Sequence, residues 1–224
     1  MASPLQGALA VAHKDLRSEL RTRFGITALG LFVLTSVSLV VFAVADEPLQ
    51  KPLASAILWV IMFYTAMTGL ARAFVSEEER GTALFLRLNS TPMNVYLGKL
   101  LVNIIFAVVS NLMATVLLLF FMGSVVVGNW VTLLATVGVG SIGLAAVLSI
   151  VSAIVAKAGS RNPLLPVLSF PLLVPLVMPG VNAMLFAFAG MGLAEAQGDL
   201  LLMISYSGII MVVSALVFEV IWTD

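Results

Sequence analysis

The chain has 224 residues, of which 61% are hydrophobic and 10% are charged, whereas soluble globular domains are about 45–50% apolar and about 25% charged. This composition excludes a soluble fold, because the chain has too little polar surface to stay in water. Its formal net charge is zero, so the order of the charges along the chain tells more than their sum. The absence of cysteine excludes disulfides and thiolate metal sites.

The first 23 residues predict an amphipathic helix that lies on the membrane surface. Apolar residues recur at intervals of three and four, at Leu5, Leu9, Ala12, Leu16 and Leu20. Another face carries the basic residues Lys14, Arg17 and Arg21. We expect the apolar face to lie in the cytoplasmic headgroup layer. The alternative is a solvated basic arm, which would not need the leucine spacing.

Six apolar runs follow, over residues 25–45, 53–75, 100–122, 131–156, 164–194 and 200–221. Each is long enough to cross the roughly 30 Å hydrocarbon core as a helix, and a helix satisfies every backbone polar group within its own segment. We therefore predict an all-α integral membrane protein with six transmembrane helices. It forms a single transmembrane domain over residues 1–224, composed of the interfacial helix at 1–23 and a six-helix bundle at 24–224.

The basic residues fall on one side of these predicted spans. Of the 11 lysines and arginines, only Lys51 lies on the other side. That other side carries the acidic residues Asp46, Glu47, Glu195 and Asp199. Because lysine and arginine in short loops stay in the cytoplasm, we expect both termini to be cytoplasmic.

The longest cytoplasmic connection, residues 75–99, is expected to be structured. Ser76 and Glu79 have the spacing of a capping box, and the Asn-Ser-Thr-Pro sequence at 89–92 predicts a break before the third span. Residues 83–88 are too apolar to be left in water. We expect them to pack against the bundle or against a docked soluble partner.

The fifth run is rich in proline, at Pro163, Pro166, Pro171, Pro175 and Pro179. Each proline removes a backbone donor and clashes with the preceding turn. This predicts a span over about 163–178, a break at 179–180 and an apolar segment over 181–194 that dips back from the outer face. The alternative is one kinked, tilted span followed by an apolar outer loop. Because the freed carbonyls need partners, we expect this region to lie against protein rather than lipid.

The chain lacks the motifs of an enzyme. It contains no Gly-x-x-x-x-Gly-Lys-Ser/Thr loop to hold nucleotide phosphates. Its one histidine, His13, precedes the first span, which argues against an intramembrane Ser/His/Asp triad and against a metal site. The centres of the runs carry no charge, which disfavours a proton-coupled carrier.

Polar and small residues inside the runs predict helix contacts. Asn103 and Asn111 are eight residues apart and lie near one helical face. They either bond to neighbouring helices or line a path, and helix contact is the favoured role. A small-residue surface in the fourth run predicts close helix packing, at Gly138, Gly140, Ser141, Gly143 and Ser149.

Several motifs resemble those of known permeases. Glu-x-Glu-x-Gly-Thr at 77–82, Pro92 and Tyr-x-Gly-Lys at 96–99, together with six spans and an amphipathic N-terminus, resemble permease subunits of ABC-2 type exporters. The proline-rich sequence 162–175 and the ending Phe218-Glu219 resemble one branch, the heme exporter permease (CcmB) family of cytochrome c maturation. The resemblance covers essentially the whole chain, and the proline-rich sequence is its most specific part.

The resemblance implies the permease subunit of an ATP-driven complex in the bacterial inner membrane. Its implied partners are a cytoplasmic ABC ATPase, a heme-handling membrane C subunit, a small D subunit and membrane lipids, but no nucleic acid. Carried onto this chain, the segment that couples the permease to the ATPase consists of Glu77, Glu78, Glu79, Arg80, Gly81 and Thr82.

Heme iron needs an axial ligand such as His, Met, Cys or Tyr, and the runs contain neither His nor Cys. Met178 and Met184 are candidates, although packing is the commoner role of methionine in a bundle. We therefore expect the chain to bind no cofactor directly, with heme held by a partner and ATP by the ATPase. The alternatives are an ABC-2 permease for a lipid-linked glycan or a drug, and a non-transporting scaffold for cytochrome maturation factors.

Overall fold

The computed structural model describes residues 4–44, 49–70, 74, 77, 81–123, 125–157 and 164–223. In these ranges the helices are α1 (Pro4–Thr22), α2 (Phe24–Val44), α3 (Lys51–Leu70), α5 (Ala83–Asn89), α6 (Pro92–Phe121), α7 (Trp130–Lys157), α8 (Leu164–Ala189) and α9 (Leu193–Thr223). Six of them, α2, α3, α6, α7, α8 and α9, are long and apolar enough to cross a membrane. The predicted all-α fold with six spans is therefore confirmed.

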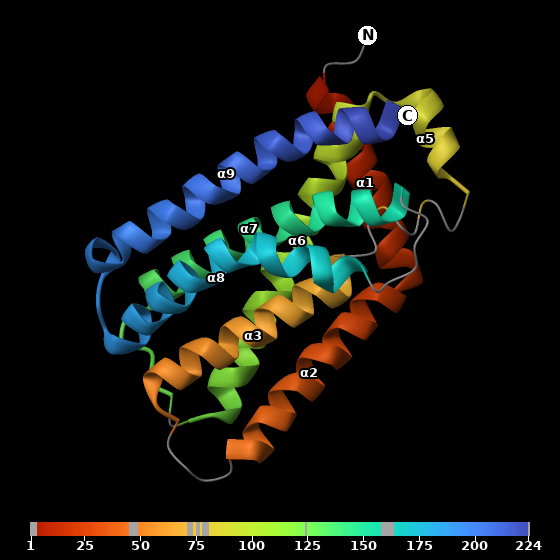
Figure 1. The fold of residues 1–224 in the computed structure, drawn as a ribbon. Helices are drawn as coiled ribbons and strands as arrows, with labels where there is room; N and C mark the ends of the chain where they lie inside the picture. Colours follow the sequence, from red (N-terminus) through yellow and green to blue (C-terminus); the bar gives the residue numbers. More distant parts are fainter. Residues whose placement is uncertain are drawn as a thin grey trace.

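The six long helices form a bundle with both chain ends at the same end of it, next to α1 and α5 (Figure 1). We call this the basic end, because it carries the described basic residues Lys14, Arg17, Arg21, Lys99 and Lys157. The acidic end is opposite and carries Glu195 and Asp199. An even number of crossings requires this arrangement of the termini.

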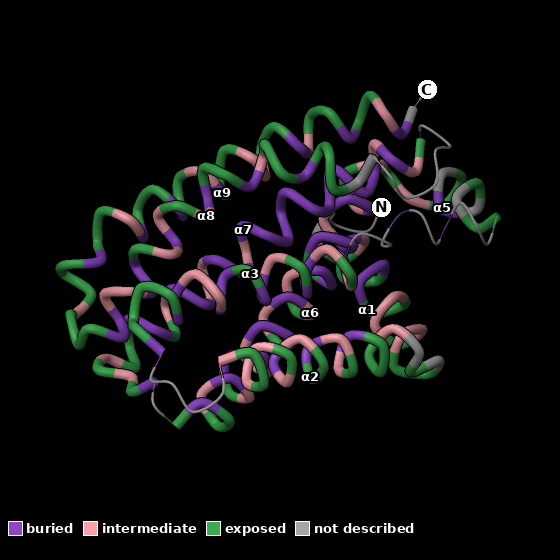
Figure 2. The backbone as a smooth tube through the Cα atoms, turned by 60° about the horizontal axis from the view of Figure 1, so that its bottom comes forward, coloured by how far each residue is buried: buried purple, intermediate pink, exposed green. Residues whose placement is uncertain are grey.

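Helix α7 is the centre of the bundle, with 78% of its span buried, whereas α2 has only 11% buried and lies at the periphery (Figure 2). Small residues let neighbouring helices approach α7 closely. The Trp59 ring of α3 lies over Gly140, where an added Cβ would be 2.8 Å from it, and over Gly180 of α8, where the distance would be 1.9 Å. Gly143 likewise makes room for Leu176 of α8, because an added Cβ at position 143 would lie 2.6 Å from the Leu176 side chain.

The outer faces of α2 and α9 carry large exposed apolar side chains, among them Leu39, Phe42, Leu202 and Leu216. Lipid tails are as apolar as leucine, so these faces need no protein partner in a bilayer. The buried core instead runs along α7 and the inward faces of α3, α6 and α8.

Helix α8 contradicts the predicted break in the fifth run. It is continuous from Leu164 to Ala189 with Pro171, Pro175 and Pro179 inside it. The predicted break at 179–180 and the segment dipping back over 181–194 are therefore wrong. Helix α8 ends at Ala189, and a short turn leads to α9 at Leu193.

The spacing of the prolines explains why α8 persists. Pro171, Pro175 and Pro179 are four residues apart, so they share one face, and the hydrogen bonds of the other faces remain. The first two are exposed, so this face does not lie against protein within the chain as predicted, although α8 itself packs on α3, α7 and α9. From α9, the Tyr206 hydroxyl donates to the carbonyl of Leu172, 2.5 Å away.

Two helices begin earlier than the apolar runs. Helix α6 begins at Pro92, with Thr91 as its N-cap residue in an extended conformation, and it therefore contains Lys99. Helix α9 begins at Leu193 and contains Asp199. Both charged residues bounded a predicted run, but each has a side-chain partner in the structure, because Lys99 forms ion pairs and Asp199 accepts a hydrogen bond from Asn182.

Candidate functional site

The candidate site lies at the basic end, where α1 rests on α6. Ala8, Val11 and Ala12 of α1 are buried there. Gly98 of α6 makes room for this contact, because an added Cβ would lie 2.7 Å from the carbonyl oxygen of Ala8. The exposed Leu9 and Leu20 lie on another face of α1, so the small residues rather than the leucine stripe hold α1 to the bundle.

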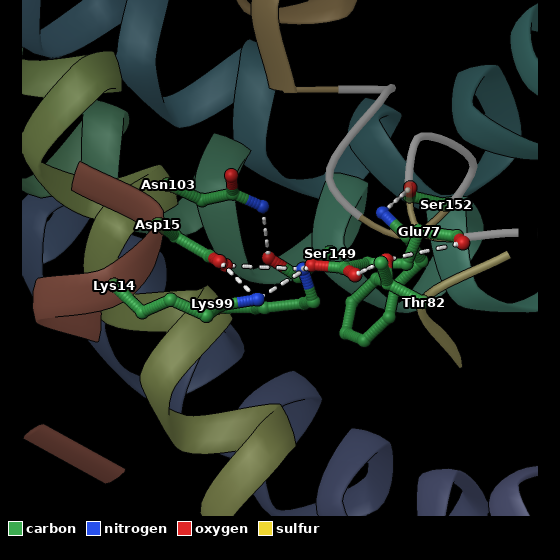
Figure 3. A network of polar contacts seen from close by, with 9 residues as sticks. Lys14, Asp15, Glu77, Thr82, Lys99, Asn103, Ser149 and Ser152 are labelled. Atoms are coloured by element: carbon green, nitrogen blue, oxygen red, sulfur yellow. Dashed lines mark hydrogen bonds and ion pairs between the residues drawn. The ribbon is translucent and has the colours of Figure 1, made fainter. Parts of the chain in front are cut away.

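Four charged side chains meet in this region, which we call the charged quartet: Lys14, Asp15, Glu77 and Lys99 (Figure 3). Glu77 Oε1 accepts from both lysines, at 2.8 Å from Lys14 Nζ and 3.1 Å from Lys99 Nζ. Asp15 pairs with the same two lysines, at 2.9 Å from Lys14 and 3.0 Å from Lys99. The quartet therefore joins α1, the connection between α3 and α5, and α6.

Lys99 is the most deeply placed member of the quartet, with 2% of its side chain exposed. A buried ammonium group is costly unless it is paired and hydrogen-bonded. Two carboxylates supply that pairing, and the ring of Phe74 lies 5.3 Å from Lys99 Nζ in a cation–π contact. The two positive and two negative charges sum to zero, which makes the burial tolerable.

The surroundings hold Glu77 ionised. Burial works to raise the pKa of its carboxyl, but the charge of Lys99 and hydrogen bonds from Lys14 and Thr82 outweigh burial and lower it from 4.5 to about 2. For Lys14, burial works to lower the pKa, but hydrogen bonds and charge from Glu77 and Asp15 outweigh burial and raise it. Both groups therefore carry their charges at neutral pH.

Phe74 attaches the same connection, between α3 and α5, to helices α7 and α9. Its backbone N–H donates to Ser152 Oγ of α7 at 3.3 Å. Its ring lies 5.1 Å from that of Phe218 and 6.4 Å from that of Trp222, both in α9. The Glu77 N–H donates to the Phe74 carbonyl at 3.1 Å, so the two attachments are directly linked.

The predicted coupling segment is only partly described. Glu77 lies in the charged quartet, and its side chain accepts a hydrogen bond from the Thr82 hydroxyl. The Thr82 N–H donates to the Glu77 carbonyl at 3.0 Å, and Gly81 adopts a φ of +68°, which favours glycine. Glu78, Glu79 and Arg80, together with the capping residue Ser76, lie outside the described residues. Of the predicted interfacial basic residues, Lys14 joins the quartet, while Arg17 and Arg21 are exposed.

The two asparagines of α6 face α7. Asn103 Nδ2 donates to Ser149 Oγ at 2.8 Å, and Asn111 Nδ2 donates to Ser141 Oγ at 2.9 Å. Both acceptors belong to the small-residue surface of α7. Of its three glycines, Gly140 and Gly143 lie close to other helices, whereas an added Cβ at Gly138 would meet nothing within 4 Å. The predicted site prolines are elsewhere, since Pro166, Pro171 and Pro175 lie on the exposed side of α8.

Sequence reasoning missed two members of the quartet. From the sequence alone, Lys99 is an orienting charge at the edge of a span and part of the Tyr-x-Gly-Lys motif, and Asp15 receives no role. One available signal was that Asp15 is an acidic residue next to Lys14 in a mostly basic helix. The Tyr-x-Gly-Lys motif was the other, because it puts the small Gly98 beside Lys99 where another helix can approach.

The fold and the charged quartet define a multi-pass α-helical membrane protein in which four ion pairs of the described residues gather at one end. The family model described as CcmB protein matches residues 6–220, so the chain belongs to the CcmB family. This family is that of the heme exporter permeases of cytochrome c maturation. A search of the curated proteins found no match to the chain.

Proposed function

We propose that the chain is the permease subunit of an ATP-driven complex that exports or handles heme for c-type cytochrome biogenesis in the bacterial inner membrane. Membership of the CcmB family over residues 6–220 is the observation that carries the proposal. A separate cytoplasmic ABC ATPase binds and hydrolyses ATP. A heme-handling membrane C subunit and a small D subunit complete the complex.

The surface of the basic end supports a docked ATPase. Helix α5 has only 7 residues, too few to span a membrane, yet Leu84 and Leu88 are 66% and 77% exposed on it. Exposed apolar side chains on a helix that does not span the membrane are suited to contact with a protein partner. In the proposal, the ATPase contacts α5 and the coupling segment at 77–82 and moves them as it closes on ATP.

Heme iron is held by a partner in this proposal. Met184 is fully buried in α8, whereas Met178 is 71% exposed. The two are six residues apart and point to different faces of the helix, so they are poorly placed to ligate one iron together. The placement of these two methionines favours a mechanical role for this chain.

Co-purification from native membranes tests the proposal. We expect the tagged chain to recover an ATPase and a heme-containing membrane subunit, and the reconstituted complex to show vanadate-sensitive ATP hydrolysis that requires this chain. Recovery of an ATPase without any heme protein would instead favour an ABC-2 permease for a lipid-linked glycan or a drug. Recovery of heme proteins without an ATPase would favour a non-transporting scaffold.

A further inference from the structure

We infer that Lys99 is a positioning residue that, with Asp15, locks the coupling connection to α1 and α6, so that the three move as one unit. The inference deepens the proposed function, on which its coupling part rests. The observation behind it is that the buried Lys99 ammonium contacts carboxylates from two other chain segments, at 3.0 Å from Asp15 and 3.1 Å from Glu77.

Stability alone does not account for a quartet built around a buried lysine. The desolvation of buried charges offsets most of their attraction, and well-packed apolar residues often stabilise a fold as well or better. What the quartet adds is specificity, because any arrangement that takes the carboxylates away from Lys99 leaves a buried charge unpaired, which is strongly unfavourable. The quartet stands where α1, the connection and α6 meet, so it sets the register of these segments.

The connection has a second attachment that completes the unit. Phe74 bonds to Ser152 of α7 and packs on Phe218 and Trp222 of α9, while Glu77 follows it within one turn. A displacement of the connection therefore acts on α1 and α6 through the charges of the quartet. The same displacement acts on α7 and α9 through the Phe74 ring and backbone.

Lys99 rather than Lys14 is the central member. The Lys14 side chain is 47% exposed, so water can replace its partners, whereas Lys99 is 2% exposed and cannot exchange them for water. Removing the Lys99 charge leaves the half-exposed Lys14 as the one positive charge of the quartet that pairs with Asp15 and Glu77. Both carboxylates, at 15% and 10% exposure, then repel each other across the vacated position.

The test measures the position of the connection and the coupling separately. Spin labels at His13→Cys in α1 and Leu88→Cys in α5, both exposed positions in a chain without cysteine, report the distance between these helices in the purified full-length chain, where no ATPase covers α5. We expect Lys99→Met to broaden the distance distribution and Lys99→Arg to restore it. Lys157→Met is the matched control, since Lys157 is an exposed lysine at the same end.

The second readout is the number of c-type cytochromes matured per ATP hydrolysed. We expect this ratio to fall about tenfold in Lys99→Met, within the usual range of coupling between sites, and to recover in Lys99→Arg. If Lys99→Met does not assemble, Asp15→Asn removes the same pairing from α1 and is expected to broaden the distance distribution equally.

An unchanged distance distribution in the folded Lys99→Met or Asp15→Asn chain would overturn the inference, as would an unchanged ratio in the assembled complex. Failure of the proposed function looks different. If the wild-type chain binds no ATPase, the ratio has no meaning, but the spin-label distances in the isolated chain still decide whether Lys99 positions the connection.

Discussion

Glu77 accepts hydrogen bonds from three side chains, those of Lys14, Lys99 and Thr82. Of these three donors, only Thr82 is close to Glu77 in the sequence. Because of these donors the pKa of the Glu77 carboxyl is about 2, so the group remains ionised well into the acid range. Its charge is therefore a fixed part of the basic end at physiological pH rather than a switch.

Stability should fall in acid partly because of Glu77. With a pKa near 4.5 in the unfolded chain and about 2 in the folded chain, the unfolded state binds more protons between these values. The contribution of Glu77 is thus complete above pH 4.5 and is lost as the pH falls toward 2. We expect thermal unfolding in detergent, measured from pH 7 to pH 3, to show a shallower decline for Glu77→Gln. Parallel curves for the two proteins would contradict this.

The contact of Trp59 with Gly180 gives a second prediction at a single residue. A Cβ at position 180 would lie 1.9 Å from the Trp59 ring, so Gly180→Ala should force the ring or α8 to move and cost about 1–3 kcal/mol of unfolding free energy. Gly138→Ala is the control, because nothing lies within 4 Å of its added Cβ. Equal denaturation midpoints for both variants would show that the ring moves without cost.

At the scale of elements, α6 and α7 are joined by amide-to-hydroxyl bonds from Asn103 and Asn111. We expect Asn103→Leu to destabilise the protein, because it removes the bond to Ser149. A double-mutant cycle of Asn103→Leu with Ser149→Ala isolates the bond itself, and we expect a coupling energy of about 0.6 kcal/mol and no more than about 1.7 kcal/mol. A coupling energy near zero would mean that the asparagine acts through a different contact.

The elements themselves were predictable to the extent that apolar length decides them. Six runs of about 20 residues or more have no other stable form in a bilayer, and all six are helices. The predicted starts of two helices were wrong, because Lys99 and Asp199 were treated as boundaries of the apolar runs. Each of these charged residues lies within a helix because it has a side-chain partner that the sequence does not reveal. The predicted break in α8 was wrong because prolines in a row were counted without considering that they share one face.

The charged quartet was predictable only in part for a related reason. Glu77 and Lys14 stood out by motif and by helix face, but the pairing of Asp15 with Lys99 joins residues 84 positions apart. That pairing depends on how α1 docks on α6, which in turn depends on the small Gly98. A small residue in one segment indicates that a helix can approach there, but it does not identify which helix docks or in which register.

At the scale of the whole molecule, the two ends differ in charge, and this difference gives a prediction of orientation. The basic end should face the cytoplasm. Leu88→Cys at the basic end and Gln197→Cys at the acidic end are both exposed and stand in a chain without native cysteine. A membrane-impermeant maleimide added to intact spheroplasts should label position 197, and label position 88 only after permeabilisation. Labelling of position 88 from outside would reverse the topology.

The last helix is longer than a membrane requires. Helix α9 has 31 residues, which at about 1.5 Å per residue extends well beyond a hydrocarbon core of about 30 Å. Its final turns carry Phe218 and Trp222 beneath Phe74. A premature stop codon just before position 218 would still leave α9 long enough to cross the hydrocarbon core. Such a truncated protein could keep all of its spans, but its connection would lose the two aromatic rings against which Phe74 packs.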